Sequence, residues 1–216
     1  MTESNKNILK NKENTRFCLI QAASKLFSSL GYDKVSTRDL AQVAQVNISM
    51  ISYHFGGKEG LYKQVLFDFA ENIKNNVEEI FTEFTSREIN KENFIKTMSR
   101  VIDHMVHNRI DNPEICILLS REKIEGLPHS REVHEILFSP LVKKFIFLIE
   151  KAQESKIIRA DLKPLLFFTL LTEGIWGFFE LTACHISGFE HHTHLLKDPI
   201  ELRNEIIKIY LEGALL

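Results

Sequence analysis

A stripe of apolar residues at a spacing of four is the feature that most constrains how this chain can fold. The stripe runs along residues 58–84, and its members are Leu61, Val65, Phe69, Ile73, Val77, Ile80 or Phe81, and Phe84. This spacing places the side chains on one face of an α-helix of about six turns. A helix of this length is typical of one that links two parts of a molecule.

Patterns typical of helices cover most of the remaining sequence. Gly31 marks a helix stop, Ser36 and Asp39 form a capping-box pattern, and Asn47 and Asp198 are suited to cap further helices. Glycine and proline are sparse, at nine and five residues, and no stretch is typical of a strand. We therefore predict an all-α protein. Besides 58–84, its helices are predicted at residues 15–30, 37–43, 47–55, 91–108, 113–125, 130–155, 161–186 and 198–213.

The predicted helices fall into two groups. Residues 1–14 are polar and are expected to form a disordered tail. Residues 15–62 are expected to form a small N-terminal domain, and residues 63–216 a larger helical domain after it. The long helix would join the two.

The composition indicates a soluble, cytoplasmic protein without a cofactor. Apolar residues make up 44% of the chain and charged residues 26%, and the N-terminus lacks the apolar segment of a secretory signal. The most apolar run, 165–186, contains Glu173 and Glu180, which a membrane span would rarely accept, so we predict a buried helix there. The three cysteines lie far apart, which favours a reducing compartment over disulfides or a zinc site. They are Cys18, Cys116 and Cys184.

Charge is distributed unevenly along the chain. The net charge of −2 divides into +4 over residues 1–63, from nine basic and five acidic residues, and −6 over residues 64–216. A basic N-terminal part followed by an acidic remainder is expected when only the N-terminal part binds a polyanion.

Two short predicted helices, 37–43 and 47–55, flank a tight turn, which is helix-turn-helix spacing. The second helix has an apolar back made of Ile48 or Ile51 together with Phe55. Its other faces carry short hydroxyls, a phenol and an imidazole, which suit contact with base edges and phosphates better than with water alone. Those residues are Ser49, Met50, Ser52, Tyr53 and His54.

Lys58 stands where the next helix begins, although a cation at a helix N-terminus opposes the helix dipole. A phosphate at this position would be attracted by Lys58, by the dipole and by the N–H groups together. The preceding Gly56 and Gly57 let the backbone approach closely. The spacing excludes a Walker loop, because no glycine stands at position 52 and Glu59 occupies the Ser/Thr position.

Residues 22–61 resemble the DNA-binding domain of the Tet-repressor (TetR) family of bacterial transcription regulators. The matching features, in order and at the family's spacing, are Ala22-Ala23, Leu26-Phe27, Gly31-Tyr32, Leu40-Ala41, Val46, Tyr53-His54-Phe55, Lys58-Glu59 and Leu61. The resemblance implies a three-helix helix-turn-helix domain, with the motif at about residues 36–55. It also implies a larger, divergent helical domain that binds a ligand and dimerises.

The resemblance implies roles for individual residues. Thr37, Tyr53, His54 and Lys58 match phosphate-contacting positions, and Arg38 matches a reader of base or phosphate. The groove-facing positions of the recognition helix are Ile48, Ser49, Met50 and Ser52. Three departures from the family pattern are Gln45 in place of a turn glycine, Asn47 in place of a Ser/Thr cap, and Ser52 in place of a common tyrosine. A non-glycine at 45 costs about 1 kcal/mol if the turn is left-handed.

The function that the resemblance implies is a dimeric repressor that a small molecule releases from a palindromic operator in double-stranded DNA. The alternative is the same fold acting as an activator or without an effector. The predicted ligand-pocket residues are Met105, Cys116, Glu173, Trp176 and Phe179. The predicted dimer-interface residues are Gly174, Gly177, Leu202, Ile206 and Ile209, because helical glycines suggest close backbone approach and the last helix is apolar on more than one side.

A metal-dependent enzyme on a helical bundle is the distant alternative. It depends on His191, His192 and His194, which follow Gly188 in a predicted loop. A solvated loop is the better interpretation, since no cysteine lies near and Glu190 is the one acidic neighbour. Glu173 and Glu180 lie on one face of an apolar helix and are expected to line a pocket or an interface rather than to catalyse. We therefore predict no metal and no enzymatic activity.

Overall fold

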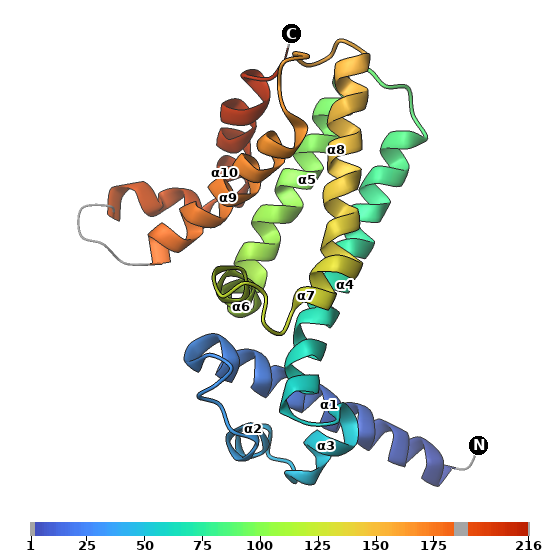
Figure 1. Ribbon diagram of the computed structural model, residues 1–216, viewed down its shortest axis with the longest axis vertical. Coiled ribbons are helices and arrows are strands. Elements are labelled where there is room, and N and C mark those ends of the chain that lie inside the picture. Colours follow the sequence, from blue (N-terminus) through green and yellow to red (C-terminus); the bar gives the residue numbers. More distant parts are fainter. Residues whose placement is uncertain (1–2, 184–189, 216) are drawn as a thin grey trace. The chain divides into compact units, whose positions relative to one another are not determined.

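The computed structural model describes residues 3–183 and 190–215, and helices account for nearly all of the regular structure in these ranges (Figure 1). The N-terminal helices are α1 (Glu3–Leu30), α2 (Thr37–Ala44), α3 (Ser49–Phe55) and α4 (Lys58–Thr85). The following helices are α5 (Lys91–Asp111), α6 (Pro113–Ile124), α7 (Arg131–Val133), α8 (Ser139–Glu154), α9 (Pro164–Ala183) and α10 (Pro199–Ile207). Short helical turns at His134–Phe138, Glu190–Lys197 and Lys208–Glu212 complete the order. The all-α prediction is confirmed.

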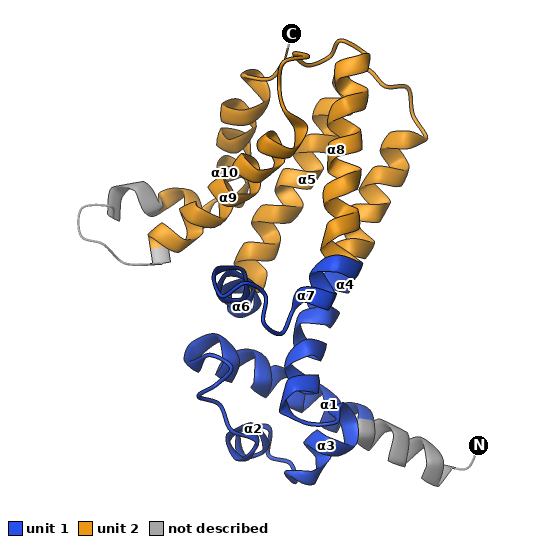
Figure 2. Cartoon of the chain, in the orientation of Figure 1, with its two compact units in different colours: residues 1–72, 113–136 blue, residues 73–112, 137–216 orange. Residues whose placement is uncertain are grey.

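The chain forms two compact units, and their boundaries differ from the predicted division at residue 62 (Figure 2). Unit 1 consists of residues 1–72 and 113–136, and unit 2 consists of residues 73–112 and 137–216. The change from unit 1 to unit 2 falls inside α4, and α6 and α7 join the N-terminal helices. Unit 1 is therefore built from two separate stretches of sequence.

The first helix is longer than predicted. α1 begins at Glu3, so residues 3–14 are helical, where the sequence analysis expected a disordered tail. The physical reason is local, because this stretch is polar but contains neither glycine nor proline, and several of its residues are good helix formers.

Unit 1 has its core between α1 and the helices that pack on it. α1 contacts α2, α3 and α6, and it contributes Leu19, Ala23 and Phe27, which are fully buried. The capping box predicted for α2 is present, since Ser36 Oγ accepts from Asp39 N (3.2 Å) and Asp39 Oδ2 accepts from Ser36 N (2.9 Å). The Ser36 hydroxyl also donates to Asp39 Oδ2 (2.6 Å), and this hydrogen bond, together with the one from Ser36 N, lowers the pKa of the Asp39 carboxyl.

Unit 2 has a continuous core formed by the C-terminal half of α4 together with α5, α8, α9 and α10. α10 packs along α5, and α9 packs against both α8 and α5. Asp198 caps α10 as predicted, because its Oδ1 accepts from Ile200 N and Glu201 N, each at 3.0 Å.

α9 departs from the prediction of a buried helix. One face, with Phe167, Leu171 and Ile175, is buried in unit 2, while Leu166 (57% exposed) and Leu170 (54% exposed) lie on the opposite face. Among the described residues, Pro164–Thr182 is the one stretch long and apolar enough to cross a membrane by length and composition. Its apolar character thus reflects two apolar faces, of which the described residues cover one.

Candidate nucleic-acid interface

The turn between α2 and α3 is left-handed at Gln45, which is the condition under which the sequence analysis assigned a cost to a non-glycine residue. Gln45 has φ 55° and ψ 42°, and Val46 N donates to Ala41 O across the turn (3.0 Å). A side chain in this region is strained by about 1–2 kcal/mol relative to the right-handed region. The turn is therefore formed in spite of its non-glycine residue, because the buried Leu40 and Ile51 on either side hold the two helices together.

The outward surface of α3 is polar and accessible. Ile51 is buried (1% exposed) and forms the apolar back of the helix, whereas Ile48 is 44% exposed, which settles the two alternatives left open by the sequence. Ser49, Ser52 and Tyr53 are exposed and Met50 is half-buried. α3 thus presents hydroxyls and one thioether on the side away from the core.

Asn47 organises the start of this surface. Its Oδ1 accepts from Ser49 N (2.9 Å) and from Ser49 Oγ (2.8 Å), so it performs the capping role predicted for it, although the helix itself is counted from Ser49. Because the Ser49 hydroxyl donates a hydrogen bond to Asn47 Oδ1, the lone pairs of the Ser49 oxygen face outward. This oxygen is therefore set to accept a hydrogen bond, which in the major groove comes from the amino group of adenine or cytosine.

Further positions of the predicted DNA surface flank α3. Arg38 is exposed in the first turn of α2, where Thr37 is half-buried. His54 is half-buried, and its ring contacts that of Tyr53 edge-on, with centroids 5.0 Å apart. All of these positions lie in unit 1, and α2 and α3 pack against each other.

Lys58 lies in the first turn of α4, as predicted, and its ammonium is held by an aromatic ring. Lys58 Nζ lies 4.1 Å from the centroid of the Tyr32 ring, a cation–π arrangement. Gly56 and Gly57 have φ values of 73° and 135°, a backbone that only glycine adopts without strain. Glu59, also in the first turn, is drawn to Lys63 (2.7 Å), and this ion pair lowers the pKa of the Glu59 carboxyl.

A buried polar cluster in unit 1 was missed by the sequence analysis. Glu122 of α6 is only 2% exposed, and its carboxylate accepts from Tyr62 Oη (2.9 Å), His129 N (3.1 Å) and Ser130 N (3.0 Å). Burial and the neighbouring carboxylate of Glu122 raise the pKa of the Tyr62 phenol. The His129 ring lies 4.0 Å from the Tyr32 ring, centroid to centroid. Glu122 therefore ties the 129–130 loop to the ring that holds Lys58.

A second link in unit 1 joins α6 to α1. Arg121 Nη1 donates to Phe27 O at the end of α1 (3.2 Å). Arg121 and Glu122 follow the apolar run Ile115–Leu119 in the sequence, and nothing in a single sequence identifies their partners.

The predicted pocket residues are divided between the two units. Cys116 is buried in unit 1, whereas Met105, Trp176 and Phe179 are partly buried in unit 2 and Glu173 is exposed. Within unit 2 the structure gathers two of them around a residue that the sequence analysis did not single out. The guanidinium carbon of Arg109 lies 5.0 Å from the Trp176 ring centroid and 6.0 Å from that of Phe179.

The predicted interface residues also separate. Leu202 (4% exposed) and Ile206 (8% exposed) are buried in unit 2, where α10 packs on α5, so assigning them to a dimer interface was wrong. Gly174 packs against a side chain of its own unit, because a Cβ there would clash with Tyr210 Oη unless the tyrosine shifted. Gly177 has open space beside it and Ile209 is 70% exposed, so both stay accessible.

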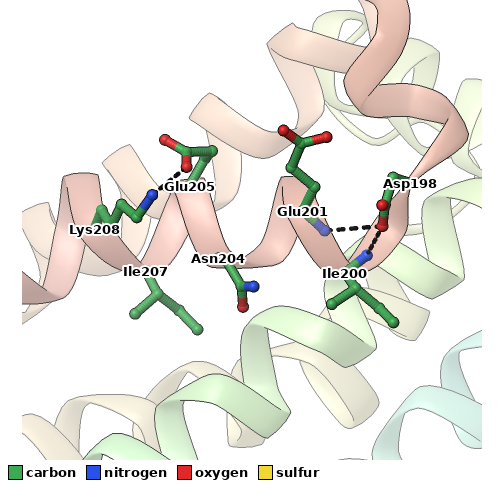
Figure 3. A pocket seen from close by; sticks show the side chains of 7 residues that line it. All are labelled: Asp198, Ile200, Glu201, Asn204, Glu205, Ile207 and Lys208. Carbon is green, nitrogen blue, oxygen red and sulfur yellow. Dashed lines mark hydrogen bonds and ion pairs between the residues drawn. The ribbon is translucent and has the colours of Figure 1, made fainter.

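A surface hollow runs along α10 (Figure 3). It is lined by Asp198, Ile200, Glu201, Asn204, Glu205, Ile207 and Lys208. The polar groups there are engaged with one another, since Asp198 caps the helix and Lys208 pairs with Glu205. None of the predicted pocket residues lines it.

The side chains of His191 and His192, two of the three histidines considered as metal ligands, lie outside the described residues, while His194 is exposed. Across the described part of the chain, no three potential metal-ligating side chains come together.

Comparison with known proteins places the N-terminal part in a defined group. Residues 19–65 match the family model described as "Bacterial regulatory proteins, tetR family". The chain is 26% identical over 148 residues to the probable HTH-type transcriptional regulator YttP of Bacillus subtilis, covering 67% of this chain and 68% of that protein. It is 30% identical over 129 residues to the HTH-type transcriptional dual regulator CecR of Shigella flexneri, covering 57% of each.

The fold also matches solved structures. The ketosteroid transcriptional regulator KstR2 of Mycobacterium tuberculosis superimposes with a TM-score of 0.71 at 15% identity, covering 93% of this chain and 95% of that one. The likeness therefore extends over both units, although at this identity it concerns the fold alone.

Proposed function

Because this chain belongs to the TetR family of bacterial transcription regulators, we propose that it is a homodimeric cytoplasmic repressor. It binds a palindromic operator and releases the DNA when a small organic effector binds. The observation that carries the proposal is the outward surface of α3, where Ser49, Ser52 and Tyr53 are exposed beside the half-buried Lys58. This combination offers both base-reading and phosphate-binding groups.

A dimer is required because one short helix reads only a few base pairs. Two DNA-reading domains, or heads, one from each copy and about 34–36 Å apart, would enter successive major grooves. The uncovered face of α9 supports this part of the proposal. It carries Leu166, Leu170 and Leu181, each at least 44% exposed, with Gly177 between them. Burying this face against a second copy of the chain would remove its apolar surface, including the surface at Gly177, from contact with water.

An experiment on the dimer uses sedimentation of Leu170→Glu and Gly177→Arg. Each places a charge or bulk on the uncovered face of α9 and is expected to give monomers with weaker operator binding. Ile124→Glu is the matched control, because Ile124 is 86% exposed in unit 1 and its replacement should leave the dimer intact. A monomer that keeps full operator affinity would overturn the coupled-heads proposal.

The DNA-binding proposal is tested by selecting bound duplexes from random DNA with the full chain. The selected sequences should contain an inverted repeat, and binding should weaken steeply as salt rises. Recovery of no preferred sequence would count against a sequence-specific regulator.

A small-molecule effector is supported by the KstR2 comparison, since that protein is described as a ketosteroid regulator. The name of CecR, a dual regulator, favours one alternative, in which this chain also activates transcription. Transcription in vitro from a selected operator, with and without the protein, separates repression from activation. The matched family and these relatives are transcription regulators and not enzymes, which excludes the metal-dependent enzyme alternative.

A further inference from the structure

Arg109 is the one arginine that is buried among the described residues, and it belongs to unit 2. Its side chain is 7% exposed, near the C-terminal end of α5 on the face that meets α9. Moving a guanidinium out of water costs several kcal/mol unless hydrogen bonds and an opposite charge compensate it. The groups around Arg109 therefore indicate which partners its buried guanidinium lacks.

Compensation within the chain is incomplete. The Nη2 atom lies 3.8 Å from Glu180 Oε1, which is too long for a hydrogen bond, and Nη1 is buried with no hydrogen-bond partner. Trp176 and Phe179 offer the guanidinium only the faces of their rings, at 5.0 and 6.0 Å. Among the described residues, the one ion pair of the guanidinium is thus the long contact with Glu180.

We propose that Arg109 anchors the carboxylate of a small organic acid whose apolar body packs against Trp176 and Phe179. A carboxylate matches the planar fork of an arginine and accepts two parallel hydrogen bonds from it. The aromatic rings beside the guanidinium suit an apolar or aromatic body and disfavour a fully hydrated anion such as free phosphate. The site deepens the proposed function, on which it rests, by giving the effector a chemical class.

Glu180 provides the route of entry. Its side chain is 50% exposed in the last turn of α9, so it can turn towards solvent and give way to the incoming acid. The ligand carboxylate then takes the position of Glu180 at a shorter distance and also satisfies Nη1. Ligand and Glu180 therefore compete for the same cation.

The experiment follows the fluorescence of Trp176, the single tryptophan of the chain, in the full-length protein without DNA. Phenylacetate and octanoate are titrated beside phenylacetamide and octanamide, which keep the apolar body but lack the charge. At least one acid is expected to give a saturable change, with an affinity about tenfold or more above that of its amide.

Variants locate the effect. Arg109→Met should abolish the preference for the acid, and Arg109→Lys should retain only part of it, because lysine keeps the charge but loses the fork. Glu180→Gln should tighten acid binding, since it removes the competing carboxylate. Arg100→Met is the matched control on the same helix; its guanidinium pairs with Glu79 and Glu83, and its loss should change nothing.

The proposal is overturned if neither acid gives a saturable change, if the amides bind as tightly, or if Arg109→Met binds the acid like the unmodified chain. If Arg109→Met fails to fold by circular dichroism, Glu180→Gln decides, and unchanged acid affinity in that variant also overturns the proposal. Release of a selected DNA duplex by the acid is measured separately. That result bears on the proposed effector response, so the site and the function can fail independently.

Discussion

Replacing Glu122 by methionine is the most informative perturbation of unit 1. Methionine keeps the length of the side chain but accepts no strong hydrogen bond, so three buried donors lose their acceptor: Tyr62 Oη and the amides of His129 and Ser130. Each orphaned donor costs about 1–3 kcal/mol. Removing a desolvated carboxylate offsets part of this lost stability, because burying a charge is itself unfavourable.

The lost hydrogen bonds are expected to outweigh that relief. Removing the shared acceptor of three buried donors should lower the free energy of unfolding of unit 1 by roughly 3–5 kcal/mol. Glu122→Gln should lower it by only about 1 kcal/mol, because the amide oxygen still accepts from the two backbone amides and its NH₂ can donate to the Tyr62 oxygen. Tyr62→Phe, which removes one donor, should also cost about 1 kcal/mol.

The assay is hydrogen exchange at the amides of His129 and Ser130, together with urea unfolding followed by circular dichroism. Trp176 is unsuitable here because it reports on unit 2. Glu122→Met should reduce amide protection by at least about a hundredfold, since each 1.4 kcal/mol is a factor of ten. Operator affinity should fall as well, because the His129 ring supports Tyr32, which holds Lys58. A methionine variant as stable as the original chain, with unchanged protection, would refute this account of the cluster.

Four further outcomes follow from individual residues of the structure. Gln45→Gly should raise the free energy of unfolding by about 0.5–1 kcal/mol, because glycine relieves the left-handed strain at φ 55°, which outweighs the added conformational entropy of the unfolded chain. Gln42→Gly, inside α2, should instead lower the free energy of unfolding by about 1 kcal/mol, and urea unfolding measures both changes. Lys58→Ala should weaken binding to all duplexes alike and reduce the salt slope by about 1 per protomer, whereas loss on one sequence only would contradict a phosphate contact. Ser49→Ala should relax a preference for a base pair that presents an amino group at one operator position, by roughly 1–3 kcal/mol in a competition assay with substituted operators. Burial lowers the pKa of His104 below its usual 6.5, so the unfolded chain takes up the proton at a higher pH than the folded chain does. The free energy of unfolding should therefore fall as the pH drops below about 6.5, and His104→Gln should reduce this dependence on pH in thermal melts.

The sequence predicted helices well because their signals are local. The capping box at Ser36, the cap at Asp198 and the stripe that gave α4 each depend on neighbours within a few residues, and each is present. Periodicity also limited the back of α3 to Ile48 or Ile51, but only packing against the other helices selected Ile51.

Contacts between distant residues could not be predicted. Tyr62 and its acceptor Glu122 are 60 residues apart, and no local pattern pairs them. The same limit explains the error at Leu202 and Ile206, whose apolar spacing is equally consistent with an interface and with the α5 packing that the structure shows. A helix with two apolar faces, such as α9, gives one average hydropathy, and a sequence does not say which face a neighbour covers.

The two-part construction of unit 1 has a consequence for how the protein is made. The ribosome delivers α1 to α4 first, but Tyr62 Oη acquires its acceptor, and Phe27 O its second donor after Gly31 N, only when residues 121 and 122 of α6 follow. At typical rates of synthesis this delay lasts roughly 3–12 s. During that interval the nascent head exposes the aromatic surface of Phe27, Tyr32 and Tyr62, so chaperone binding should be strongest on chains arrested before residue 121 and should drop once the 129–130 loop has emerged.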